Sequence, residues 1–79
     1  MSNIIPLSDL PNRTKARIHE IHGGHQLQQR LTVMGIRKGQ IITLISKQPF
    51  RGPITIQLYG SQMTLGRGMA RHIIVEVMT

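Results

Sequence analysis

Three histidines and one glutamate fall within residues 19–25, which read His-Glu-Ile-His-Gly-Gly-His. Imidazole and carboxylate groups suit borderline transition metals such as zinc, nickel or iron, which makes His19, His22 and His25 candidate metal ligands. The spacing differs from the H-E-x-x-H motif, in which two histidines share a helix face at i and i+4. A run of exposed polar residues is the alternative interpretation. We therefore expect no resident cofactor, with at most incidental binding of a transition metal.

Side chains that could perform catalysis are sparse in this chain. Asp9, Glu20 and Glu76 are the only acidic residues and lie far apart in the sequence. Acid–base catalysis, by contrast, requires a positioned pair of titratable groups. The chain has no cysteine, and none of its serines stands in the G-x-S-x-G context of a nucleophile elbow. We expect a protein that is not an enzyme.

The chain is strongly basic. Ten Lys and Arg residues face three acidic ones, for a formal net charge of +7. This imbalance favours acidic or polyanionic partners, which include nucleic acid, an anionic membrane surface and an acidic protein. The basic residues are scattered, with Arg37 and Lys38 the only adjacent pair, so a merely solvated cationic surface is the alternative. Binding of single-stranded nucleic acid also uses aromatic stacking platforms, and Phe50 and Tyr59 are the only Phe, Tyr or Trp residues.

Apolar residues that alternate with polar ones, or that are β-branched, predict a series of short strands. In residues 14–21, Ala16 and Ile18 fall on one face, and Ile21 breaks the alternation in a way that indicates a bulge near Glu20. The other expected strands are residues 41–47, 54–58, 63–65 and 73–77.

Proline, glycine and short polar residues mark the turns between these strands. Residues 59–62 predict a tight hairpin turn, and residues 66–71 predict a helical turn. Residues 4–11 carry a polar pair between two prolines. They predict a single turn of helix that tucks Leu7 and Leu10 against the core.

The only helical periodicity spans residues 25–34, where apolar residues recur at i, i+4 and i+7, namely Leu27, Leu31 and Met34. We expect Met34 to pack in the core beneath this helix. Gly35 stands where a left-handed C-terminal cap is expected, and Ile36 can supply the hydrophobic contact that accompanies such a cap.

These elements predict a mainly β fold with one short helix, arranged as a small closed or nearly closed barrel of about five strands. A chain of 79 residues supports one domain, residues 1–79. No window approaches the roughly 18 consecutive apolar residues that span a bilayer. The N-terminus lacks the basic and apolar regions of a signal peptide. We therefore expect a soluble cytoplasmic protein.

Several short motifs occur in a fixed order over nearly the whole chain. They are Leu7-Ser-Asp-Leu10, Ile18-x-x-Ile-x-Gly-Gly24, Arg30-Leu31, Met34-Gly-Ile-Arg-Lys-Gly39, Pro49-x-x-Gly-Pro53, Leu65-Gly-Arg-Gly-Met-Ala70 and Ile73-Ile-Val75. Together they resemble the ferrous iron transport protein A family (FeoA), essentially from Ile5 to Val77.

The resemblance implies an SH3-like β-barrel, in its stand-alone form, that acts in the cytoplasm as an accessory to ferrous iron uptake. The implied partner is the large membrane permease of the same system (FeoB), which carries a cytoplasmic GTP-binding domain. Through that partner the protein would be peripheral at the inner membrane. Family members are thought to bind or regulate the permease rather than carry iron themselves. The family has no agreed catalytic or metal motif, so the resemblance transfers no site residues.

A partner-binding surface is expected because SH3-like barrels present loops and an apolar groove to partner segments. From expected exposure and turn chemistry, the candidate partner-binding residues are Gln28, Gln29, Arg30, Arg37, Phe50 and Arg51. Met63 or Met69 could line such a groove, with core filling as the alternative for each. Two other functions stay open. One is a basic RNA- or ribosome-associated small barrel, and the other is a metal-binding protein that uses the three histidines of residues 19–25.

Overall fold

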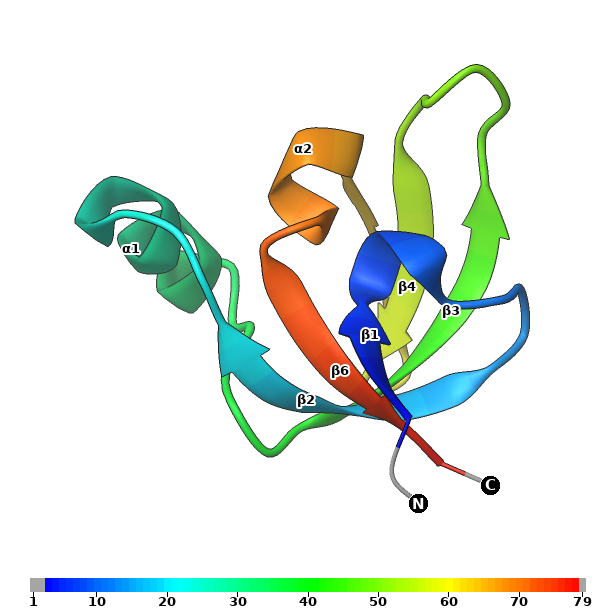
Figure 1. Ribbon diagram of the computed structural model, residues 1–79, viewed down its shortest axis with the longest axis horizontal. Coiled ribbons are helices and arrows are strands. Elements are labelled where there is room, and N and C mark those ends of the chain that lie inside the picture. Colours follow the sequence, from blue (N-terminus) through cyan, green and yellow to red (C-terminus); the bar gives the residue numbers. More distant parts are fainter. Residues whose placement is uncertain (1–2, 79) are drawn as a thin grey trace.

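One antiparallel sheet runs through the computed structural model, which describes residues 3–78 (Figure 1). Within those residues its six strands follow the order β1-β6-β2-β3-β4-β5. The strands are β1 (Ile4–Pro6), β2 (Lys15–Ile21), β3 (Ile41–Lys47), β4 (Ile54–Leu58), β5 (Ser61–Leu65) and β6 (Ile73–Val77). The helical elements are the 3₁₀ turn η1 (Leu7–Asp9), α1 (His25–Val33) and α2 (Arg67–Ala70). The mainly β fold class is confirmed, although the sheet bends without closing, because β1 and β5 remain its two edges.

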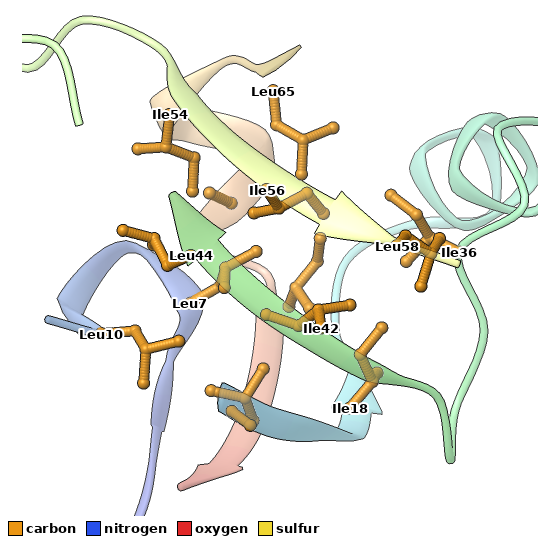
Figure 2. Close-up of a cluster of buried hydrophobic side chains, with 14 of the residues drawn as sticks. Leu7, Leu10, Ile18, Ile36, Ile42, Leu44, Ile54, Ile56, Leu58 and Leu65 are labelled. Atoms are coloured by element: carbon orange, nitrogen blue, oxygen red, sulfur yellow. The ribbon is translucent and has the colours of Figure 1, made fainter. Parts of the chain in front are cut away.

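Alternation along the strands decides which side chains are buried. Ala16 and Ile18 of β2 point into the core, whereas the alternate residues Lys15, Arg17 and His19 are exposed, as the sequence predicts. Figure 2 shows aliphatic side chains from the strands and from η1 converging on one interior. The buried cluster is Leu7, Leu10, Ala16, Ile18, Leu31, Ile36, Ile42, Leu44, Ile54, Ile56, Leu58, Leu65, Ala70, Ile73 and Val75. Both aromatic rings of the chain lie outside this cluster.

Two irregularities in pairing help the sheet to bend. The register between β2 and β6 shifts between Ile18 and Glu20, which confirms the bulge expected from the break in alternation. A second shift separates Leu44 from Ser46 where β3 pairs with β4. An extra residue on one strand increases the local twist and bends that strand. The bends turn the alternating aliphatic positions of several strands towards one another.

The turn between β4 and β5 is shorter than the sequence predicts. Tyr59 and Gly60 both have positive φ, at 53° and 78°, and Leu58 pairs directly with Ser61. Two central residues with positive φ are typical of a type I′ turn, whose twist matches that of the flanking strands. The strand β5 therefore begins at Ser61, two residues earlier than expected.

The N-terminal segment corrects the expectation of a single helical turn over residues 4–11. Ile4 pairs with Glu76 and Pro6 pairs with Ile74, so this segment begins as the edge strand β1. Proline is tolerated there because an edge strand can leave one side of its backbone unpaired. A helical turn does follow, over Leu7–Asp9. The count of strands thus rises from about five to six.

The joint between α1 and β3 has the hydrogen bonds of a Schellman motif. Gly35 has φ 89°, its N–H donates to the Thr32 carbonyl at 2.9 Å, and the Ile36 N–H donates to the Leu31 carbonyl at 2.9 Å. These are the two reversed bonds that close a helix on a left-handed residue. Leu31 and Ile36 are both buried, so the accompanying hydrophobic contact is present as well. The cap predicted at Gly35 is confirmed.

Met34 does not pack in the core, contrary to the expectation from helical periodicity. The helix ends at Val33, and Met34 is its C-terminal cap residue. Leu31 is the one fully buried residue of α1, which stands away from the sheet in Figure 1. The cap turns the chain before Met34 can reach beneath the helix, and 36% of its surface stays exposed.

The same substitution should have opposite effects at Gly35, which has positive φ, and at Gly68, which lies within a helix. Gly35→Ala is expected to destabilise the domain by about 1–2 kcal/mol, because a Cβ is disfavoured at positive φ although no atom lies nearby. Gly68→Ala, within α2 and also without a close neighbour, is expected to be stabilising by roughly 0.5–1 kcal/mol. In thermal unfolding, each kcal/mol of stability gained or lost should shift the Tm by roughly 4–8 °C. Equal losses at both glycines would contradict this account.

Candidate partner-binding surface

The three histidines of residues 19–25 are not brought together. His19 lies on β2, His22 follows that strand, and His25 begins α1. His22 Nε2 contacts the Glu20 carboxylate at 2.9 Å, an exposed pair two residues apart. Across residues 3–78, no three His, Asp or Glu side chains gather closely enough to hold a metal ion. Metal binding by His19, His22 and His25 therefore stays a prediction for which the structure offers no assembled ligand set.

Large apolar side chains are instead exposed where α1 ends beside the β4–β5 turn. Val33 is 81% exposed and Tyr59 is 82% exposed. Met34 lines two adjoining depressions of about 660 and 570 Å³, one against the β4–β5 turn and one along α1. We call this surface the helix–hairpin groove and define it by Gln29, Arg30, Val33, Met34, Arg37, Lys38, Tyr59 and Met63.

The floor of the helix–hairpin groove is held by one half-buried amide. Gln40 Nε2 donates to the Gly35 carbonyl at 2.7 Å, and its Oε1 accepts from the Arg37 N–H at 2.7 Å. The backbone of the same segment bonds to β2, with the Gly39 N–H donating to the Ile18 carbonyl at 2.8 Å. Fixing this segment before a partner arrives reduces the ordering cost of binding.

The groove is basic as well as apolar. Arg30, Arg37 and Lys38 line its two depressions, and no carboxylate does. Glu20 lines a neighbouring depression together with Arg37 and Lys38, and its hydrogen-bond contact is with His22. An apolar patch with a positive rim suits a partner segment that carries an apolar anchor beside acidic residues, because complementary charge steers the encounter and the buried anchor supplies affinity.

The six partner-binding residues expected from the sequence fall into two separate regions. Gln29, Arg30 and Arg37 line the helix–hairpin groove. Gln28 faces a neighbouring depression, and its Nε2 donates to the Gly23 carbonyl at 3.0 Å, which supports the start of α1. Phe50 and Arg51 belong instead to the loop between β3 and β4. That loop lies at the far side of the fold from α1 in Figure 1.

Sequence reasoning missed Val33, Met34 and Tyr59 as groove residues. Val33 lies off the buried stripe of α1, and an apolar residue on the polar side of an amphipathic helix is the signal that could have found it. Tyr59 sits in a tight turn, where a large ring cannot reach the core. Met63, for which groove lining and core filling were both open, is partly buried against the core and also lines the groove.

A family model and a curated relative indicate one family. The model of the FeoA domain matches residues 5–77. A curated relative from Methanocaldococcus jannaschii, named Fe(2+) transport protein A, is 35% identical over 71 residues, which cover 90% of this chain and 84% of the relative. The crystal structure of an iron uptake regulatory protein (FeoA) is 32% identical with a TM-score of 0.88, covering 96% of this chain and 100% of that one. A FeoA-like protein from Clostridium acetobutylicum is 28% identical with a TM-score of 0.88, covering 100% of this chain and 92% of its own.

The contact between Glu20 and His22 predicts a shifted titration. The hydrogen bond from His22 and the imidazole's charge hold the pKa of Glu20 below its usual range. A carboxyl group with a lowered folded-state pKa contributes stability above its unfolded-state pKa and loses it as the pH falls through the folded-state pKa. By NMR, the Glu20 carboxyl should titrate below an ordinary Glu. His22→Ala should raise its midpoint, and His25→Ala should not. An unshifted midpoint in the unmodified chain would contradict the contact.

Proposed function

The chain belongs to the FeoA family, and from that premise we propose that it is a cytoplasmic accessory protein of ferrous iron uptake that binds the cytoplasmic part of the iron permease (FeoB). Family membership links the chain to ferrous iron transport. The residues that would make the contact come from this chain's own surface. None of the helices within residues 3–78 is long and apolar enough to cross a membrane, so a role at the permease would depend on such a contact.

The observation that carries this proposal is the helix–hairpin groove. Val33 and Tyr59 give almost nothing to the folding of this chain because they stay in water. Covering a Val, Met or aromatic side chain fully with a partner contributes about 1.5–3 kcal/mol. Three such anchors together contribute about 4.5–9 kcal/mol, which is comparable to the cost of association. Further contacts along the groove, including those of its basic rim, must therefore supply the net affinity.

The charges along the groove indicate the chemistry of the partner segment. Arg30, Arg37 and Lys38 have no ion-pair partner among residues 3–78. We therefore expect the permease to present apolar residues flanked by Asp or Glu. Such contacts at the rim accelerate association and weaken as salt screens them.

Binding, rather than catalysis, is also the role that the acidic residues support. Asp9, Glu20 and Glu76 lie on different elements, namely η1, β2 and β6. Glu20 contacts His22, and both side chains are exposed. No depression described above is lined by two carboxylates. A proposal of regulation through contact therefore needs no reaction at this protein.

Met34 offers a sharp test because Met78 is a matched control. Met78 is 40% exposed, close to the 36% of Met34, but it follows β6 and lies outside the groove. Met34→Gln keeps the length of the side chain and removes its apolar end. We expect this variant to weaken binding to the permease's cytoplasmic domains about tenfold, or about 1.4 kcal/mol. Met78→Gln should leave the affinity unchanged, with thermal unfolding confirming that both variants are folded.

The same binding experiment separates the other two functions. Equal affinities of the Met34 and Met78 variants would remove the groove from the proposal. Binding to RNA with a steep dependence on salt, and none to the permease domains, would favour a basic RNA- or ribosome-associated barrel. Tight ferrous iron binding that disappears when His19, His22 and His25 are replaced would favour a metal-binding protein.

A further inference from the structure

Three arginines surround a depression of about 420 Å³ between the β3–β4 loop and α2. Its lining residues are Arg51, Arg67, Gly68 and Arg71. No carboxylate lines it, and none of the three arginines forms an ion pair within the part of the chain that the structure describes. Three like charges around one hollow repel each other unless an anion lies between them. The depression therefore has the charge of an oxyanion site.

Arg67 is fixed in place without being neutralised. Its Nε donates to the Gly52 carbonyl at 3.1 Å, and its Nη2 donates to the Gln48 carbonyl at 3.1 Å. Carbonyl groups orient a guanidinium but carry no net charge, and a guanidinium has five N–H donors, so several remain for an external oxygen. These two bonds also tie the β3–β4 loop to α2, so the loop and the arginines form one surface.

Phe50 projects from this surface into water. Its side chain is 99% exposed at the tip of the loop. Phe50 and Arg51 both have positive φ, at 58° and 59°, a conformation that side chains other than glycine and asparagine adopt rarely. The fold therefore holds an apolar ring outward, beside three cations, where the ring contributes nothing to the core.

We propose that the β3–β4 loop docks this protein directly onto an anionic membrane surface. The ring of Phe50 enters the headgroup region, and the guanidinium groups of Arg51, Arg67 and Arg71 contact lipid phosphates. Basic residues beside an apolar side chain are the combination by which peripheral segments bind anionic leaflets. This contact is with lipid and not with the permease. The proposal therefore goes beyond the proposed function and can be tested independently of it.

The chemistry of the loop favours a membrane over other anions. A soluble phosphate would make no favourable contact with the exposed apolar ring of Phe50. A nucleic acid strand stacks successive bases on several aromatic rings, but the other ring, Tyr59, lies at the opposite end of β4. Five residues of extended strand separate the two turns by about 16 Å. This separation also leaves the helix–hairpin groove open when the loop contacts lipid.

Flotation with lipid vesicles tests the proposal. The protein should float with phosphatidylcholine vesicles that contain phosphatidylglycerol, and it should not float with phosphatidylcholine alone. Phe50→Asn removes the ring and keeps a residue that tolerates positive φ. We expect it to weaken vesicle binding about tenfold. Tyr59→Asn is the matched control, because Tyr59 is also exposed with positive φ, and it should leave vesicle binding unchanged.

A second matched pair separates the arginine site from net charge. Arg51→Asn and Arg13→Asn remove the same charge from exposed residues with φ 59° and 61°, but only Arg51 lines the depression. Arg51→Asn should weaken vesicle binding about fivefold, and Arg13→Asn should have a much smaller effect. Equal effects within either pair, or no flotation with phosphatidylglycerol, would overturn the proposal. So would saturable binding of inorganic phosphate or of an RNA oligonucleotide that Arg51→Asn abolishes, in the absence of vesicle binding.

Discussion

A single bent sheet has to bury almost all of the apolar surface that this short chain can bury, and that constraint governs the rest of the structure. A domain of this size buries a modest fraction of its surface and has little stability to spare. Its buried cluster consists of Leu, Ile, Val and Ala side chains from alternate strand positions and a few turns. The register shifts between Ile18 and Glu20 and between Leu44 and Ser46 bend the strands that must face one another. Larger amphipathic side chains are left to the outside.

The aliphatic residues of the interior stabilise the fold, whereas the exposed apolar and basic residues are free to contact other molecules. The helix α1 is fastened through Leu31 and the Schellman cap, which frees Val33 and Met34 for the helix–hairpin groove. On the other side, Arg67 fastens the β3–β4 loop through two carbonyls and leaves Phe50 exposed. Both surfaces are therefore supported by hydrogen bonds to backbone groups but contribute little to the core. The exposed side chains of such a surface can therefore be substituted with little effect on the stability of the fold.

Local signals explain which parts of the structure the sequence could predict. The strands at Ile41–Lys47 and Ile54–Leu58, the bulge at Glu20 and the cap at Gly35 depend on neighbouring residues, and each was predicted correctly. The strand β1 depends on pairing with β6 at the other end of the chain. Its three residues are too few to show an alternating pattern, so the sequence did not predict it. The position of Met34 depends on where the cap turns the backbone. Whether Phe50 lies near Arg30 depends on the whole topology, so the sequence could suggest exposed candidate residues but could not predict which of them lie together.

The pairing of the first strand with the last has a consequence for how the domain can be connected. Ile4 lies opposite Glu76, and the Val77 N–H donates to the Asn3 carbonyl at 2.9 Å. The two ends of the described chain therefore leave the sheet side by side (Figure 1). Domains with adjacent ends tolerate insertion into a loop of another protein and circular permutation. This unit can thus be joined to another chain at one position, where both of its ends lie, and the two proposed contact surfaces are formed by other elements.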